Sequence, residues 1–389
     1  MKKIAAFFTA VVLFFTAAIS AHIIAGERID TNNADFGTWI NSKKDLSYQA
    51  VSRNIEEDSV LMLGSSEFHH GKKTKYHPTA IFRSLGMNVM CIGAAKNQCL
   101  SHAITVGAIA PEMKNKKVVL ILSPSWFSKE GIDQDGFSAR FSGSMYEAFI
   151  KNESISKETR KAVAERVTYL LEKSPGAGEE AVRAEKIYLD GEKKLNNGIT
   201  FITKRWFSRE KELINVGLMW KATGEQNNDE YTISPKGEEP DWDALARDAD
   251  ASLEGKTNNP FNMKDKLYNT KIKPTEAARK NADEGRTYEK SPEYDDLRLF
   301  LDVCKEQNME VLLVMLPVNG WWYDYTGFAK EKRETFVTGV HAIAEEYGVK
   351  TADFFDESYT YGFLEDVVHP AGKGWVKINE AAYKFYNEN

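Results

Sequence analysis

Short continuous apolar runs alternate with longer amphipathic stretches along the chain, a pattern typical of buried parallel strands separated by helices. Apolar residues at helical spacing, as in residues 294–307 and 330–347, predict helices between the runs. Strands are predicted at residues 60–64, 87–93, 118–122, 311–316 and 350–353. We therefore expect an α/β protein with a three-layer α/β/α architecture around a parallel five-stranded sheet.

Residues from about 128 to 291 depart from this alternation. They are rich in charge, mostly helical in periodicity and interrupted by polar loops. We interpret them as a large helical insertion between the third and fourth strands of one domain, residues 26–389. A separate domain in this region is the alternative.

The amino-terminal residues 1–25 are predicted to lie outside this domain. Lys2 and Lys3 precede a stretch, residues 4–25, that contains no formal charge apart from His22. About 20 apolar residues suffice to cross a bilayer, and flanking positive charge favours the cytoplasmic side. We expect a single-pass anchor in the cell membrane with the remaining chain extracellular. A cleaved signal peptide, with a small-residue site near position 21, is the alternative.

Composition narrows the classes of function. The chain is 42% hydrophobic and 28% charged, with a net charge of -6, so no basic field suggests nucleic-acid binding. Three cysteines, Cys91, Cys99 and Cys304, are too few for a disulfide framework and are expected to be buried thiols, although a Cys91–Cys99 bond is an alternative. No Cys/His spacing of a zinc site occurs, so neither a metal nor a cofactor is expected.

The first predicted strand runs into Gly64-Ser65-Ser66-Glu67. In open α/β sheets, functional groups gather at the carboxyl ends of strands, and a following turn offers free backbone N–H groups to an anion. We predict that Ser66 is a catalytic nucleophile. A serine hydroxyl needs an imidazole to take its proton and an acid to orient that imidazole.

His369 is the candidate base, with Asp366 as the orienting acid. Asp366 stands three residues earlier, in a loop after the last strand, so both side chains can project the same way. Strand ends of a parallel sheet meet at one edge, which allows this loop to reach Ser66. The other six histidines are less suited to act as the base. His22 lies in the membrane segment, His102 and His341 lie in predicted helices, and no acid is placed to orient His69, His70 or His77.

The Gly-Ser-Ser-Glu sequence resembles the Gly-Asp-Ser opening of the SGNH (GDSL-like) hydrolases, which also take their base and acid from a late Asp-x-x-His. This resemblance implies oxyanion donors at the N–H of Ser66, at Gly93 after the second strand, and at an asparagine after the third. Residues 123–125 do not supply that asparagine. Asn97 or Gln98 is the candidate substitute.

Several motifs together are similar to those of the DltD family over nearly the whole chain, including the helical stretch. They are Gly64-Ser-Ser-Glu-Phe68, Ser123-Pro-Ser-Trp-Phe127, Asn258-Asn-Pro-Phe261, Ser291-Pro-Glu-Tyr294, Pro317-Val-Asn-Gly320, Trp322-Tyr-Asp-Tyr-Thr-Gly327 and the late Asp-x-x-His. Gly374-Trp375 preserves only part of the glycine-tryptophan pattern expected after the histidine.

The resemblance implies transfer of D-alanine as an ester onto hydroxyls of lipoteichoic acid at the outer face of the cytoplasmic membrane. It implies partnership with a membrane-bound O-acyltransferase and, across the membrane, with a D-alanyl carrier protein. Ser66 would carry the acyl group, and His369 would act first as base and then as acid.

Three lysines follow the nucleophile closely: Lys72, Lys73 and Lys75. They are candidate contacts for a phosphate-bearing acceptor, against the alternative of a solvated loop. Trp126, Trp321 and Trp322 could line a cleft, but core packing is the favoured interpretation.

The same residues are compatible with other functions. An exported esterase or thioesterase would use the same triad and release the acyl group to water. A sugar-polymer O-acetyltransferase of the same fold would carry acetate. An anchored docking protein for the D-alanylation machinery would not use Ser66 chemically.

Overall fold

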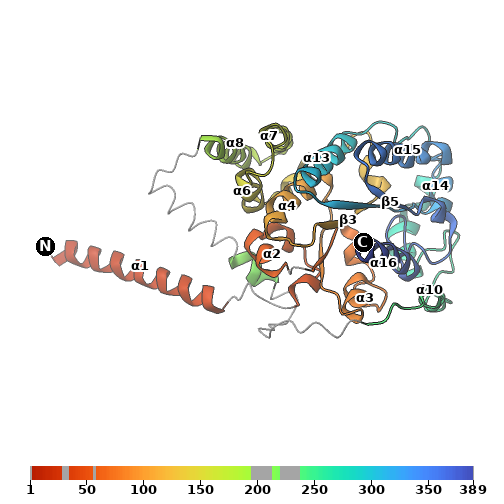
Figure 1. The fold of residues 1–389 in the computed structure, drawn as a ribbon, viewed down its shortest axis with the longest axis horizontal. Coiled ribbons are helices and arrows are strands. Elements are labelled where there is room, and N and C mark those ends of the chain that lie inside the picture. Colours follow the sequence, from red (N-terminus) through yellow and green to blue (C-terminus); the bar gives the residue numbers. More distant parts are fainter. Residues whose placement is uncertain (1, 29–34, 56–57, 194–212, 220–236, 389) are drawn as a thin grey trace.

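The computed structural model describes residues 2–28, 35–55, 58–193, 213–219 and 237–388. Five parallel strands form one sheet in the order β2-β1-β3-β4-β5. Their bounds are β1 Val60–Gly64, β2 Val89–Gly93, β3 Lys117–Leu122, β4 Glu310–Met315 and β5 Lys350–Asp353. The predicted parallel five-stranded sheet is confirmed, with helices on both faces (Figure 1).

Alternate strand residues face two separate hydrophobic cores. In β1, Leu61 and Leu63 pack on one face, while Val60 and Met62 pack on the other. Successive side chains of a strand point to opposite faces, so a strand covered on both sides must be apolar at every position. This geometry explains the continuous apolar runs in the sequence.

The larger core lies under most of the helices. They are α2 Tyr48–Asn54, α4 Cys99–Ile109, α5 Gln134–Arg140, α6 Gly143–Lys151, α7 Lys157–Lys173, α8 Gly178–Lys193, α13 Glu293–Glu306, α14 Gly320–Tyr325 and α15 Lys330–Tyr347. The opposite face is covered by α3 Pro78–Ser84, α10 Trp242–Ala251 and α16 Gly372–Asn387.

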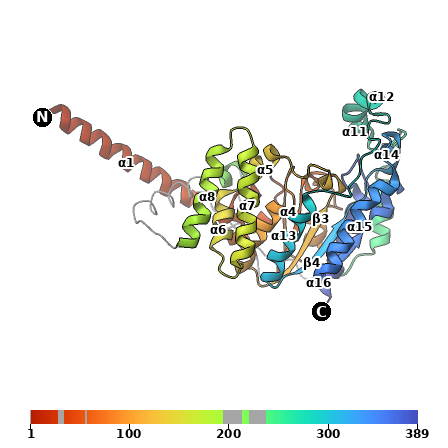
Figure 2. The same cartoon turned by 90° about the horizontal axis from the view of Figure 1, so that it is seen from above.

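The helices between β3 and β4 pack on both faces of the sheet. Figure 2 shows α6, α7 and α8 stacked beyond α4 and α13, and α11 (Asp265–Leu267) and α12 (Glu276–Arg279) projecting beside α14. By contrast, Trp242 of α10 packs into the core under α16. Part of the predicted insertion, at 194–212 and 220–236, lies outside the described residues.

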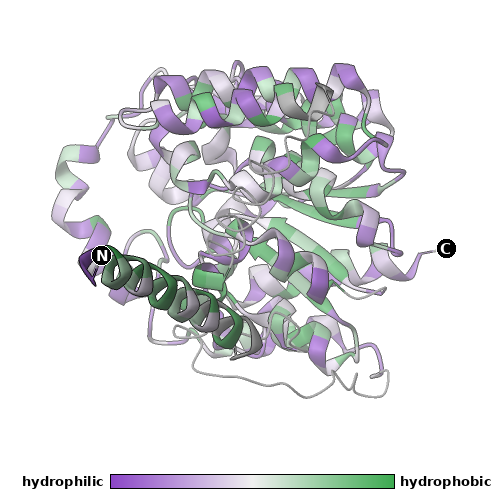
Figure 3. Ribbon diagram, turned by 90° about the vertical axis from the view of Figure 1, so that its left-hand side faces the viewer, coloured by the Kyte–Doolittle hydropathy of each residue, from purple (hydrophilic) through white to green (hydrophobic). Residues whose placement is uncertain are grey.

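Helix α1, Lys2–Arg28, projects from the body in Figures 1 and 2, and Figure 3 shows that it is largely apolar. Within the described part of the chain it is the one helix long and apolar enough to cross a membrane. It has the length and composition of a membrane anchor or of a signal sequence.

The three cysteines are free and buried. The alternative of a Cys91–Cys99 bond is therefore wrong. Cys91 in β2 packs into the core beneath α16, whereas Cys99 at the start of α4 packs into the core on the other face. The sheet separates the two thiols.

Candidate active site

The carboxyl end of β1 is held against β2 at two facing glycines. Gly64 and Gly93 are register partners, and a Cβ atom on Gly93 would lie 2.4 Å from the Gly64 carbonyl oxygen. A side chain at Gly93 would therefore force the two strand ends to shift. His102 of α4 donates from Nε2 to the same carbonyl oxygen at 2.8 Å. These contacts fix the backbone from which the next turn begins.

Ser66 opens a 3-10 turn, Ser66–His69, after β1. The Glu67 carboxylate accepts the Ser65 N–H at 2.7 Å, and the Ser65 hydroxyl donates to the Ala94 carbonyl oxygen at 3.0 Å. The turn is thus closed on itself and tied to the loop after β2. Ser65 is buried by these bonds, whereas Ser66 stays half-buried.

The loop that carries Asp366 and His369 is built around the Asp366 carboxylate. Asp366 Oδ1 accepts backbone N–H groups from Val368 at 3.0 Å and from His369 at 2.9 Å. The Glu365 N–H donates to the His369 carbonyl oxygen at 2.9 Å. An aspartate that bonds the backbone two and three residues ahead forms a local turn, which directs the His369 ring back over the carboxylate.

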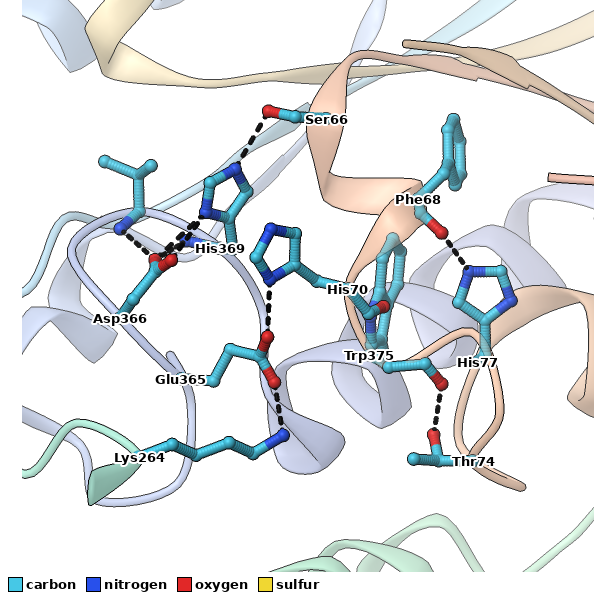
Figure 4. A network of polar contacts seen from close by, with 12 residues as sticks. Ser66, Phe68, His70, Thr74, His77, Lys264, Glu365, Asp366, His369 and Trp375 are labelled. Atoms are coloured by element: carbon cyan, nitrogen blue, oxygen red, sulfur yellow. Dashed lines mark hydrogen bonds and ion pairs between the residues drawn. The ribbon is translucent and has the colours of Figure 1, made fainter. Parts of the chain in front are cut away.

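The fold brings the three predicted residues into one hydrogen-bonded chain (Figure 4). His369 Nδ1 lies 2.9 Å from Asp366 Oδ2 and 3.0 Å from Oδ1, so its N–H donates to the carboxylate. Nε2 is then free to accept the Ser66 hydroxyl proton at an Oγ–Nε2 distance of 2.8 Å. A serine, an imidazole and a carboxylate in this order can activate the serine hydroxyl as a nucleophile.

Electrostatics favour an ionised Asp366 and a basic His369. Burial would raise the pKa of Asp366, but hydrogen bonds from His369 and its charge outweigh that effect and lower the pKa to about 2. Burial would lower the pKa of His369, but Asp366, with smaller contributions from Glu67 and Glu365, raises it above the ordinary 6.5. Asp366 therefore stays charged and stabilises the protonated imidazole.

A second histidine, His70, stands beside the first. Its Nδ1 donates to Glu365 Oε1 at 2.5 Å, and Lys264 pairs with the other oxygen of Glu365. The His70 and His369 rings are stacked, with centroids 3.8 Å apart and planes 6° from parallel. The expectation that no acid orients His70 is therefore wrong, because an acid 295 residues later in the chain reaches it.

A third nearby histidine, His77, has a structural role. It is buried and donates from Nε2 to the Phe68 carbonyl oxygen at 3.0 Å. Burial lowers its pKa to about 3, so it stays neutral at physiological pH.

Asn319, which follows β4, supports this site, and this role was not predicted from the sequence. Its side-chain N–H groups donate to the Phe261 carbonyl oxygen at 2.8 Å and to the Asp366 carbonyl oxygen at 3.4 Å. Its position within the quoted Pro317-Val-Asn-Gly320 motif, at a strand end, was the available signal.

The expected oxyanion donors differ in their surroundings. Ser66 and Gly93 lie at the carboxyl ends of the neighbouring strands β1 and β2. Asn97 Oδ1 accepts the Ala94 N–H at 3.2 Å, and the Asn97 amide opposes the rise in the pKa of Asp45 that burial causes. The bond to Ala94 occupies the side-chain oxygen of Asn97, and the role of its N–H groups as an oxyanion donor stays a prediction.

All three lysines after the nucleophile, Lys72, Lys73 and Lys75, are exposed, but one of them has an acidic partner. Lys75 Nζ pairs with Asp248 Oδ2 of α10 at 2.5 Å, which gives it a structural partner. Among the tryptophans considered as cleft residues, Trp126 and Trp322 are buried in the larger core and Trp321 packs against it. This placement agrees with the favoured interpretation of core packing.

His70, Asp366 and His369 place potential metal-ligand atoms within 4.8 Å of one another. This cluster was not predicted from the sequence. The hydrogen bonds within the Ser66–His369–Asp366 chain and between His70 and Glu365 already account for the approach of these groups. No metal is needed to explain the arrangement.

Comparison with known proteins agrees with the resemblance seen in the sequence. The family model described as DltD protein matches residues 33–387. A Bacillus subtilis (strain 168) protein named Protein DltD is 28% identical over 399 residues, covering 99% of this chain and 98% of the relative. Proteins of the same name from Staphylococcus aureus and Lacticaseibacillus rhamnosus are 26% and 25% identical, covering 88% and 85% of this chain and 87% and 78% of their own lengths. The chain belongs to the DltD family.

Proposed function

We propose that this protein transfers D-alanyl groups onto hydroxyls of lipoteichoic acid at the outer face of the cytoplasmic membrane, through an acyl-enzyme on Ser66. Its family takes part in D-alanylation of teichoic acid. The observation that carries the catalytic part of the proposal is the continuous Ser66–His369–Asp366 chain, with bonds of 2.8 and 2.9 Å.

In the first half-reaction, the Ser66 hydroxyl gives its proton to His369 Nε2 while Oγ forms a bond to the carbonyl carbon of the D-alanyl donor. The carbonyl oxygen becomes an oxyanion, for which we propose the backbone N–H groups of Ser66 and Gly93 as donors. When the bond to the donor's leaving group breaks, His369 returns the proton to that group. Ser66 then holds D-alanine as an ester.

In the second half-reaction, a hydroxyl of the polymer takes the place of the leaving group. It gives its proton to His369 Nε2 as its oxygen bonds to the acyl carbon. The Ser66 Oγ–carbon bond breaks, and His369 returns the proton to Oγ. The product is a D-alanyl ester on the polymer, and the enzyme is restored.

The remaining parts of the proposal concern the surroundings of the reaction. Helix α1 supports a location at the membrane surface. A membrane-bound O-acyltransferase would pass on the D-alanyl group that a carrier protein supplies from the cytoplasm. Exposed Lys72 and Lys73 are proposed to contact phosphates of the acceptor.

The test uses the full-length protein in detergent with a D-alanyl thioester as donor. Mass spectrometry of the quenched protein should find a D-alanyl adduct on Ser66, and adding a glycerol-phosphate polymer should move the label to the polymer. Transfer only to water would support an esterase or thioesterase instead. An acetyl adduct from mixed donors would support an O-acetyltransferase, and no adduct, with normal teichoic D-alanine in cells carrying Ser66→Ala, would support a docking role.

A further inference from the structure

The neighbourhood of Ser66 contains two acid–imidazole pairs lying face to face. His369 is bonded to Asp366, His70 is bonded to Glu365, and the two rings are stacked at 3.8 Å (Figure 4). Both rings use Nδ1 for the carboxylate. The second pair contributes no bond to Ser66 in the chain described above, and its side-chain contact with the triad is the stacking of His70 on His369.

His70 is held both through its side chain and through its backbone. Lys264, from the segment between β3 and β4, pairs with Glu365 through its Nζ and donates its backbone N–H to the Glu365 carbonyl oxygen at 2.8 Å. Trp375 of α16 donates from Nε1 to the His70 carbonyl oxygen at 2.9 Å. Trp375 itself is fully buried, so the His70 backbone rests on the rigid core.

The stacked contact restrains a motion that the triad bonds leave open. Bonds to Ser66 and Asp366 hold the two nitrogens of His369, but the ring can still tilt about the line through them. A flat ring at van der Waals distance on one face opposes that tilt. Misplacement of a catalytic group by about 1 Å costs on the order of 10²-fold in rate, so such a restraint has a measurable consequence.

We propose that His70 is a positioning residue for His369, and that Lys264 of the helical insertion sets it in place through Glu365. The inference rests on the proposed function, because it assigns His369 the role of base for Ser66. It also gives the insertion a part in catalysis: Lys264 joins this segment to the loop that carries the base.

Because charged groups surround His369, the pH dependence of the Ser66 reaction can test this arrangement. Asp366 and Glu365 face it from its own loop, Glu67 and His70 from the segment after β1, and Lys264 approaches through Glu365. The negative charge of Glu365 raises the pKa of His369. Removing that charge should lower this pKa, and removing the opposing charge of Lys264 should raise it.

The test measures the second-order rate at which a fluorophosphonate probe labels Ser66 in the full-length protein, from pH 5 to pH 9. His70→Ala should slow labelling roughly 10- to 100-fold, whereas His70→Phe, which keeps a flat ring, should restore most of the rate. Glu365→Gln should move the acid limb of the profile to lower pH and Lys264→Met to higher pH. His341→Ala is the matched control, because His341 is exposed and pairs with Asp353 at 3.0 Å.

Wild-type rates and an unchanged acid limb in His70→Ala and Glu365→Gln would overturn the inference while leaving the proposed function intact. Equal losses in His70→Ala and His70→Phe, with no shift of the limb in the Glu365 and Lys264 variants, would also overturn it. If the thermal unfolding curve shows that His70→Ala does not fold, the two charge variants test the inference instead. It then requires that the acid limb move to lower pH in Glu365→Gln and to higher pH in Lys264→Met. Failure of wild-type Ser66 to react at all would refute the proposed function itself and this inference with it.

Discussion

The backbone N–H of Asn319 donates to the carbonyl oxygen of Val367 at 2.8 Å, joining the loop after β4 to the loop that carries Asp366 and His369. The Asn319 side chain also receives the Trp322 N–H at 2.9 Å, which caps α14. One buried residue therefore secures both the start of a helix and the position of the candidate base.

Asn319→Ala should lower the free energy of unfolding by about 2–4 kcal/mol. The substitution removes a helix cap, worth about 1 kcal/mol, and leaves the Phe261 carbonyl without its partner, at a cost of about 1–3 kcal/mol. Urea denaturation measures the change. Asp241→Ala is the matched control, because Asp241 caps α10 at an exposed site and should cost only about 1 kcal/mol. Equal losses in both variants would contradict a linking role for Asn319.

Ser66→Ala should abolish the acyl adduct and lower transfer by at least about 10⁴-fold, because no other hydroxyl is bonded to His369 Nε2 among the contacts of the described residues. Ser65→Ala tests the adjacent hydroxyl, which is occupied by the Ala94 carbonyl oxygen. That variant should still form the adduct and lose only about 1 kcal/mol of stability. An adduct that persists in Ser66→Ala would exclude Ser66 as the nucleophile.

Acylation of Ser66 should increase with pH through a midpoint above 6.5. His369 acts as a base only when neutral, and its neighbours raise its pKa above that ordinary value. Asp366→Asn should lower the plateau by about 10⁴-fold and move the midpoint to lower pH, because the orienting and charge-stabilising carboxylate is lost. Stopped-flow measurement of adduct formation across pH gives both quantities. A midpoint unaffected by the substitution would refute the assignment of Asp366.

Asp366 should also make stability depend on pH. Its folded-state pKa of about 2 lies below the ordinary value of 3.8, so the ionised form favours the folded state. The contribution, about 2 kcal/mol, is fully present above roughly pH 4 and is lost as the pH falls toward 2. Comparing urea unfolding of wild type and Asp366→Asn between pH 2 and pH 5 isolates it. The difference between the two proteins should shrink as the pH falls.

Gly93→Ala should destabilise the fold by about 1–3 kcal/mol, because its methyl group would meet the Gly64 carbonyl oxygen at 2.4 Å and force the two strand ends apart. The same movement should slow acylation, since Ser66 follows Gly64 by two residues. Gly178→Ala is the control, because a Cβ atom there has no neighbour within 4 Å. Thermal unfolding and probe labelling measure the two effects. A Gly93 variant as stable as the Gly178 variant would show that the strand ends can separate freely.

Replacing Lys72 and Lys73 together by alanine should raise the KM for a glycerol-phosphate polymer roughly 2- to 10-fold, the range expected for two exposed charge contacts. Acylation of Ser66 should not change, because neither lysine is bonded to the triad. Lys75→Ala is the matched control, since Lys75 is paired with Asp248. An equal rise in KM in the control would point to a general charge effect.

Local sequence patterns determined the strands and the loop at the heart of the site. Continuous apolar residues specify a strand that is covered on both faces, and this requirement is met within one short segment such as 60–63. Asp366 and His369 are three residues apart, and the turn that joins them is closed by the carboxylate itself. Such features depend on the backbone and on near neighbours, so the sequence alone predicts them.

Tertiary packing decided the contacts between distant segments. Ser66 meets His369 across 303 residues, His70 meets Glu365 across 295, and Lys75 pairs with Asp248 of α10. The Asn97 side-chain oxygen accepts the Ala94 N–H within a buried turn, a contact that its sequence position did not predict. These outcomes depend on which loops the sheet brings together and which polar groups must be satisfied there. The sequence by itself determined the strands and the acid–base loop, and the assembled fold determined which histidine reaches Ser66 and which partners Lys75 and Asn97 bind.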